Sequence, residues 1–353
     1  MNFLAIIPSA QVLRFANSEV SHHSGEPLGS LLNITSSNSV ELIVTIIALI
    51  NGQIRVVQAT VLGSIFSHLL LVLGFCFLIG GIKILIKENK LEQEFSSTAA
   101  QMTSSVMTLA CISLVLPSAF SILINYRFSN IPAVMINDKI LHISYGVSIA
   151  LLVIYLLYLC FTTKTHKILF KKYYGHKGED SREKKYENEE NEESREQRCE
   201  NEKNGEQIDG GDKSGKHISL ISSLILLIIM TAIIAISAKF LVTSIEGIVT
   251  SYNISKTFIA LVLLPIVGNG AKYANAVNTA SKNKMDTVLL ISVGSSTQSA
   301  LFITPLLVIL GWIINQPMSL FFSPFETICL FISVILKNYL VQMGNQIGWK
   351  AYC

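Results

Sequence analysis

The chain has 353 residues, half of them hydrophobic and only 14% charged, and its mean hydropathy is +0.51. A soluble domain of this length does not need so apolar a composition, so we expect an integral membrane protein and exclude a soluble enzyme. The net charge of +3 is small, and the charges gather in one mixed acidic and basic segment, which excludes a nucleic-acid-binding surface.

Apolar stretches of about 20 residues, long enough to cross a bilayer as helices, recur along the chain. The first, 2–17, is shorter and is expected to be a partial helix or a re-entrant segment. No runs of short alternating strands are found. The sequence therefore predicts an all-α polytopic membrane protein with roughly 8–10 transmembrane segments. The longer stretches lie at 31–50, 56–82, 99–125, 139–163, 218–247, 257–281, 286–314 and 319–341.

A charged segment divides the chain into two halves. Residues 164–217 hold 14 of the 24 acidic residues and 13 of the 27 lysines and arginines, which is typical of a solvated linker. The lysines that open it, directly after the fourth long stretch, place it on the cytosolic side. We expect four parts: a first transmembrane repeat at 1–163, this linker, a second repeat at 218–341 and a tail at 342–353.

The two halves resemble each other when residue n is laid on residue n plus 231 without a gap. The matches include glycines and polar residues as well as leucines, so an internal repeat is predicted. An odd number of spans before the linker makes the repeats inverted, an arrangement that places ion sites near the bilayer midplane. The matched pairs include Asn38 with Asn269, Glu41 with Lys272, Gly63 with Gly294, Ser64 with Ser295, and Leu70 with Leu301.

Asn38 and Glu41 stand three residues apart in "SSNSVELI" and so share one face of a helix. An ionised carboxylate inside a membrane costs several kcal/mol unless it is paired, hydrated or bound to an ion, which makes Glu41 a functional candidate. The alternative is a structural role, with Glu41 neutral or bonded to a polar neighbour. Asn269 and Lys272 hold the matching positions in the second half.

The segments "VLGSIFSHL" and "SVGSSTQSAL" combine glycines with side-chain oxygens. Small residues commonly serve close helix packing, and we assign Gly63 and Gly294 to it. Ser64, Ser295 and Gln298 either pack or line the site. With Asn38, Glu41 and Asn269 as metal ligands, they would supply the oxygens that a hard divalent cation such as calcium needs. His68 is expected to be a hydrogen-bonded interior residue.

These motifs are similar to those of the vacuolar calcium/proton exchangers, members of the calcium/cation antiporter superfamily. The similarity lies in "SNSVELIVTIIALINGQIRVVQATVLGSIFSHLLLVLG", "LPIVGNGAKY", "KNKMD" and "GSSTQSALF". It implies an inverted-repeat antiporter, not an enzyme, that moves calcium from the cytosol into the vacuole against protons by alternating access. It also implies a multi-pass protein of the vacuolar membrane without a cofactor. The implied cation and proton site is Asn38, Glu41, Ser64, Asn269, Lys272, Ser295 and Gln298.

The chain departs from the family pattern at its most important position. The family has a second acid where this chain has Lys272, and a histidine where it has Tyr273. A lysine about 4 Å from a carboxylate interacts with it by several kcal/mol at low dielectric, so Lys272 is expected to pair with Glu41 in place of the cation. Relatives also have a complete helix before 31–50 and one after 319–341, so both end helices are expected to be incomplete or missing.

Three functions therefore stay open. The chain is a working calcium/proton antiporter, an exchanger with altered selectivity such as a monovalent cation carrier, or a non-transporting paralogue that regulates an intact relative. The expected partners are calcium, protons and the lipid bilayer. Assembly as a homo-oligomer or with an intact paralogue stays open as well.

Overall fold

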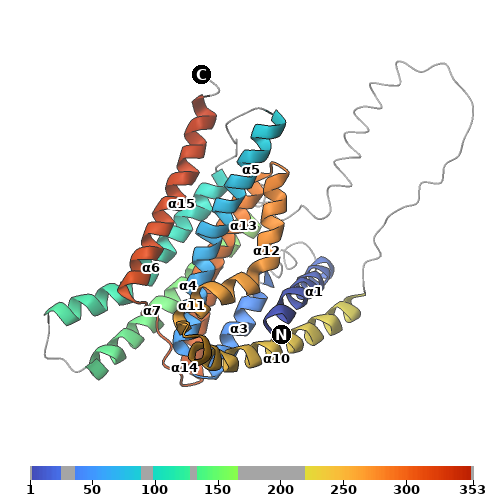
Figure 1. The fold of residues 1–353 in the computed structure, drawn as a ribbon. Coiled ribbons are helices and arrows are strands. Elements are labelled where there is room, and N and C mark those ends of the chain that lie inside the picture. Colours follow the sequence, from blue (N-terminus) through green and yellow to red (C-terminus); the bar gives the residue numbers. More distant parts are fainter. Residues whose placement is uncertain (1, 25–35, 89–97, 128–132, 166–218, 351–353) are drawn as a thin grey trace, which may run out of the picture.

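A computed structural model describes residues 2–24, 36–88, 98–127, 133–165 and 219–350 (Figure 1). Within these ranges the elements are helical and no strand occurs, which confirms the predicted all-α class. From residue 166 onward, the predicted linker lies outside the described residues.

The first half contains α1, α3, α4, α5, α6 and α7, and the second half contains α10 to α15. Short π-helical segments, η1 to η4, continue α4, α7, α11 and α13. The bounds in the first half are α1 Asn2–His23, α3 Ser39–Ile50, α4 Ile54–Phe66, η1 Ser67–Val72, α5 Leu73–Glu88, α6 Thr98–Arg127, α7 Ala133–Cys160 and η2 Phe161–Thr165. Those in the second half are α10 Leu220–Tyr252, α11 Lys256–Phe258, η3 Ile259–Leu263, α12 Leu264–Ser281, α13 Met285–Gln298, η4 Ser299–Ile303, α14 Thr304–Ile313 and α15 Pro324–Lys350.

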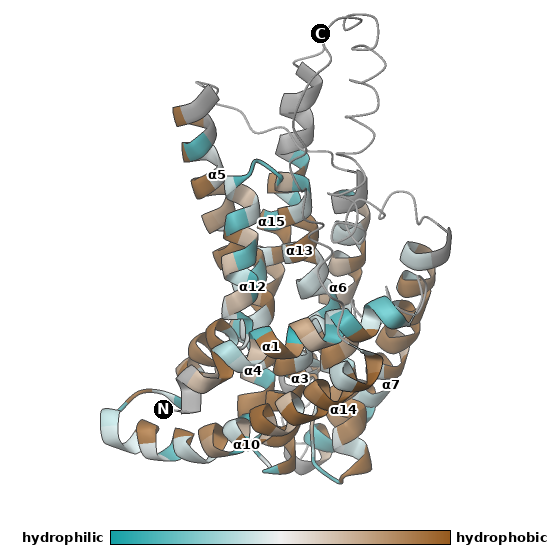
Figure 2. Ribbon diagram, turned by 90° about the vertical axis from the view of Figure 1, so that its right-hand side faces the viewer, coloured by the Kyte–Doolittle hydropathy of each residue, from teal (hydrophilic) through white to brown (hydrophobic). Residues whose placement is uncertain are grey.

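Seven stretches in the described part of the chain are long and apolar enough to cross a membrane. They agree with seven of the predicted spans to within a few residues at most ends. Many large apolar side chains on these helices are exposed, as a lipid-facing surface requires. Much of the helical ribbon in Figure 2 has the brown colour of hydrophobic residues. The spans are Ile54–Lys83, Gln101–Ile124, Met135–Thr163, Leu220–Tyr252, Lys256–Ser281, Met285–Ile313 and Pro324–Gln342.

Three predicted elements differ in length from the structure. The predicted span 319–341 is the helix α15, which continues to Lys350 through most of the predicted tail 342–353. The predicted span 31–50 appears as the 12-residue helix α3, and residues 31–35 lie outside the described part. The predicted short piece 2–17 is the 22-residue helix α1, because the helix continues through the polar residues "NSEVSHH". A helix does not have to end where its apolar stretch ends, so hydropathy alone underestimated its length.

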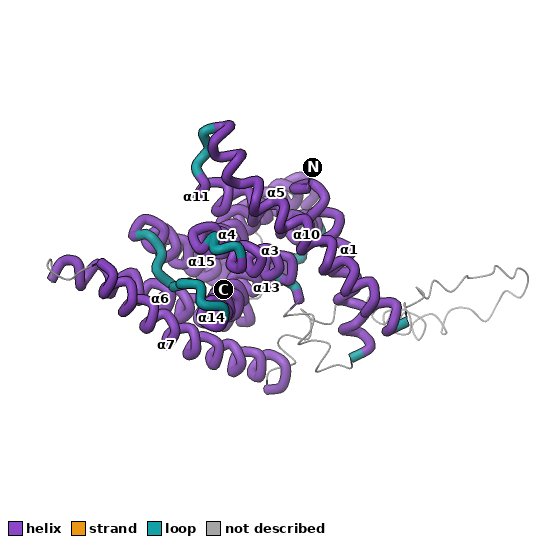
Figure 3. Tube along the Cα trace, turned by 90° about the horizontal axis from the view of Figure 1, so that it is seen from below, coloured by secondary structure: helices purple, strands orange, loops and turns teal. Residues whose placement is uncertain are grey.

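The first helices of the two halves lie side by side. α1 packs along α10, and this pair crosses the bundle obliquely against α3 and α12 (Figures 1 and 3). The internal repeat is also visible in the backbone, because η1 and η4 end at Val72 and Ile303, which are 231 residues apart. π-Helical segments occur frequently at functional sites, and both segments here follow the predicted site residues of α4 and α13.

The loop between α14 and α15 ties the second half to the first. Gln58 of α4 donates to the carbonyl oxygens of Ser319 and Phe321 at 2.9 and 3.2 Å. Arg55, at the start of α4, forms a two-pronged ion pair with Glu326 of α15 at 2.9 and 2.5 Å. These contacts hold the N-terminal part of α4 in place. Ser64, a predicted site residue, lies near the other end of the same helix.

Gly63 allows α4 to cross the second half at very short range. A Cβ atom at this position would lie 1.9 Å from the carbonyl oxygen of Leu261, which is a backbone atom and cannot rotate away. We expect Gly63→Ala to lower the free energy of unfolding by about 3 kcal/mol, the upper end of typical overpacking costs. Thermal unfolding of the purified protein measures this effect.

Gly74→Ala is the matched control, because Gly74 lies on the same continuous helix and a Cβ atom added there would meet no neighbouring atom within 4 Å. If Gly63→Ala unfolds at the same temperature as Gly74→Ala, the close crossing of α4 and η3 is contradicted.

Candidate cation site

The site forms where the two matched helices, α3 and α12, meet α4 and α13. Asn38 directly precedes α3 and Glu41 lies in its first turn, and both side chains are buried. Asn269 on α12 is buried as well, and Lys272 is half-buried one turn later. The predicted i, i+3 pairs therefore do point into one shared site.

Glu41 is held by one hydroxyl from each half of the chain. Ser64 of α4 donates to Oε2 at 2.8 Å, and Ser299 donates to the carboxylate at 3.3 and 3.4 Å. Asn269 donates in turn to the Ser64 hydroxyl at 3.3 Å. Ser64 and Asn269 thus lie beside Glu41. Ser299 was not among the site residues predicted from the sequence, although it follows the predicted residue Ser295 by one helical turn.

Asn38 is bonded to the opposite half of the chain. Its Nδ2 donates to Gln298 Oε1 at 3.1 Å and to the main-chain oxygen of Ser295 at 3.4 Å. Ser37 also donates to Gln298 Oε1, at 2.7 Å. Gln298 thus lies beside Asn38 and Ser37. Ser295 takes part through its carbonyl oxygen, where the sequence had suggested its hydroxyl.

Lys272 does not pair directly with Glu41 as expected. Its Nζ donates to Asn38 Oδ1 in a close contact, and no Lys272–Glu41 salt bridge exists among the described residues. The ammonium is still within electrostatic range of the Glu41 carboxylate. Serine hydroxyls already bond to the Glu41 carboxylate, whereas the Lys272 amine is in close contact with Asn38 Oδ1.

A second polar cluster lies beside Ser64. Tyr273 and Ser67 share a close hydrogen bond, and the rings of Tyr273 and His68 pack in a T-shaped arrangement with centroids 5.4 Å apart. His68 Nδ1 lies 2.7 Å from the Ser64 carbonyl oxygen. His68 is therefore the hydrogen-bonded interior residue that was predicted. Its contact with the Ser64 carbonyl oxygen lies within the helix that carries both residues.

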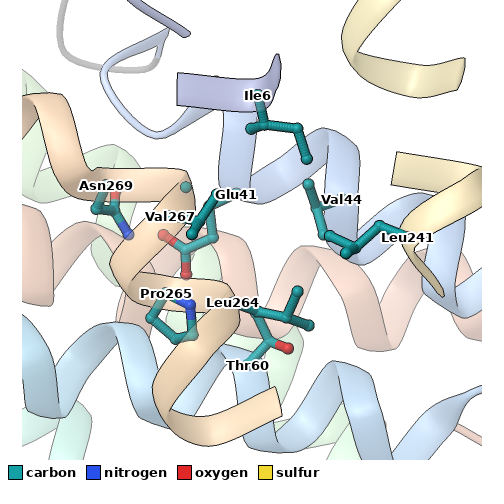
Figure 4. Close-up of a pocket in the computed structure, with 10 residues that line it drawn as sticks. Ile6, Glu41, Val44, Thr60, Leu241, Leu264, Pro265, Val267 and Asn269 are labelled. Atoms are coloured by element: carbon teal, nitrogen blue, oxygen red, sulfur yellow. The ribbon is translucent and has the colours of Figure 1, made fainter. Parts of the chain in front are cut away.

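A small cavity borders Glu41 and has room for about one water molecule (Figure 4). Its polar walls are the side chains of Glu41, Thr60 and Asn269. The remaining walls come from α1, α3, α10 and α12, and are Ile6, Val44, Leu241, Leu264, Pro265, Val267 and Gly268.

Among the described residues that line the cavity, Glu41 is the only carboxylate. In the ranges that the structure describes, no group of three or more His, Cys, Asp or Glu side chains is arranged to hold a metal ion. A cation bound here would be held by Glu41 together with neutral amide, hydroxyl and main-chain oxygens, a donor set that suits hard cations such as calcium.

Comparisons with known proteins agree with this architecture. The profile of the family "Sodium/calcium exchanger protein" matches residues 1–164 and 222–351. The vacuolar calcium ion transporter of Schizosaccharomyces pombe is 38% identical over 98% of this chain and 73% of its own length. The Ca(2+)/H(+) antiporter of Aphanothece halophytica is 37% identical over 97% of this chain and 82% of its own length.

A solved structure shares the fold. Native YfkE superposes with a TM-score of 0.69 at 27% identity, covering 97% of this chain and 83% of that one. The matched family profile extends over both helical halves, including α3, α4, α12 and α13, which build the site. The chain therefore belongs to the sodium/calcium exchanger protein family.

Proposed function

We propose that this protein is a calcium/proton antiporter of the vacuolar membrane that moves calcium from the cytosol into the vacuole. Alternating access would expose the site around Glu41 to each side in turn. The names of the relatives support calcium as the cation and protons as the counter-ion. The cytosol-to-vacuole direction and the membrane are inferred from vacuolar relatives in a fission yeast and a plant.

The observation that carries this proposal is the position of Glu41. Its carboxylate is buried between the two halves, is bonded to hydroxyls of both, and borders a cavity. A carboxylate in that position can hold a cation when ionised or a proton when neutral, but not both at once. This exclusivity couples the two fluxes.

Radiocalcium uptake into vacuolar vesicles tests the proposal. The vesicles come from cells that lack their own exchangers, and an inside-acid proton gradient is imposed. We expect uptake that stops when a protonophore collapses the gradient. Uptake equal to that of vesicles without the protein, or uptake indifferent to the protonophore, contradicts the antiporter.

A second function is favoured by the bond between Lys272 and Asn38. This bond places a positive charge in the site, which suits a non-transporting paralogue that assembles with an intact exchanger. Co-purification from the native membrane tests it: recovery of an intact exchanger together with absent calcium uptake supports this function. Absence of any exchanger in the purified complex contradicts it.

A further inference from the structure

Contacts between the two halves come in mirrored pairs. In an inverted repeat with an offset of 231, a contact between residues i and j predicts another between i plus 231 and j minus 231. Asn38 bonds to the main chain of Ser295 at 3.4 Å. At the mirrored positions, Asn269 bonds to the side chain of Ser64 at 3.3 Å. The site therefore repeats contacts as well as sequence.

The contact between Ser299 and Glu41 also has a mirrored counterpart. Ser299, in the π-helical segment η4, donates to the Glu41 carboxylate at 3.3 and 3.4 Å. The mirrored positions are His68, in the π-helical segment η1, and Lys272. The ring of Tyr273, the next residue after Lys272, packs on the His68 ring, and the Lys272 ammonium acts electrostatically on the imidazole. A cation thus replaces the carboxylate, so its partner has to be an acceptor instead of a donor.

His68 offers such an acceptor. Its Nδ1 lies 2.7 Å from the Ser64 carbonyl oxygen, and because a carbonyl only accepts, Nδ1 carries the ring proton. In the neutral imidazole, Nε2 then has a free lone pair. The side chain is 1% exposed, and Nε2 has no hydrogen-bond partner among the described residues. A buried acceptor without a donor is destabilising, and an ammonium that donated to it would remove this cost.

We propose that His68 Nε2 is a second acceptor for the Lys272 ammonium. In the structure the ammonium donates to Asn38 Oδ1, and in the alternative arrangement it donates to Nε2. Lysine carries its charge on a flexible four-carbon stem, so one side chain can serve both acceptors. The second position frees Asn38 Oδ1 for a cation. His68 is therefore a positioning residue that acts on the cation through Lys272. The role of the cation rests on the proposed function, whereas the two positions of the ammonium do not.

Nitrogen-15 NMR of the imidazoles in the purified protein tests the two positions without calcium. Asn38→Leu removes the first acceptor, so Lys272 is expected to donate to His68 and to move the Nε2 resonance upfield. The signal is assigned as the one that His68→Phe removes. The shift should be absent from the double variant Asn38→Leu/Lys272→Met. No shift in Asn38→Leu, or an equal shift in the double variant, overturns the proposal.

Equilibrium binding of radiocalcium to the purified protein is the second measurement. His68→Phe keeps an aromatic ring but removes both nitrogens, and His68→Gln keeps an acceptor. Apparent affinity falls with the fraction of molecules that can bind, so we expect about tenfold weaker binding in His68→Phe and binding within about threefold in His68→Gln. In a Lys272→Met background, His68→Phe should have no further effect, because the ammonium through which it acts is absent. Size-exclusion profiles verify folding.

The outcomes separate this inference from the proposed function. If His68→Phe leaves calcium affinity unchanged, or lowers it equally with and without Lys272→Met, the inference is overturned. Equal weakening in His68→Phe and His68→Gln also overturns it, because the lone pair would then not be the cause. If the unchanged protein neither binds nor takes up calcium, the proposed function is wrong, and the NMR shift still decides between the two positions of the ammonium.

Discussion

Lys272→Glu is expected to raise proton-driven calcium uptake by about tenfold or more. The substitution removes the ammonium that donates to Asn38 Oδ1 and adds a second carboxylate to a site that has one. Calcium affinity rises with the number of charged oxygen ligands, so the gain is expected first at low calcium concentration. Initial rates of radiocalcium uptake over a range of calcium concentrations measure it.

Two control variants identify the cause. Lys272→Gln removes the charge without adding a carboxylate. It therefore distinguishes the effect of freeing Asn38 from the ammonium from the effect of adding a carboxylate ligand. Lys282→Glu makes the same charge change at an exposed position just after the end of α12. If Lys282→Glu raises uptake as much as Lys272→Glu, general surface charge is responsible and the local explanation is wrong.

Glu41→Gln is expected to reduce calcium uptake at least about 100-fold. Removing one partner from a buried, hydrogen-bonded charged site typically costs 2–5 kcal/mol, and about 2.7 kcal/mol corresponds to 100-fold. The amide keeps the size of the side chain and can still accept from Ser64, so the fold should persist. Uptake rates are compared at equal protein amounts, with size-exclusion profiles to verify folding.

Glu246→Gln is the matched control, because Glu246 is exposed on α10 and its contacts with Gln53 and Lys256 lie away from the cavity. It should transport like the unchanged protein. Uptake that survives in Glu41→Gln would mean that Glu41 is not the coupling carboxylate, and a different group would have to carry the proton.

The apolar stretches by themselves determined the membrane class, seven of the long spans and most of their ends. Helix length across a bilayer depends on local composition, so these properties can be read without knowing any contact. The offset of 231 residues also identified the matched helices and brought Asn38, Glu41, Ser64 and Asn269 to attention. The structure gathers these four residues in one site.

Only the tertiary structure decided which atoms meet within the site. In the structure, Lys272 donates to Asn38 and not to Glu41, and Ser299 donates to Glu41. The Thr60 hydroxyl lines the cavity and has no hydrogen-bond partner among the described residues. These outcomes depend on how α3 and α4 cross helices that are more than 200 residues away in the chain. A shift of about one ångström in such a crossing exchanges one hydrogen-bond partner for another, and sequence spacing carries no information at that scale.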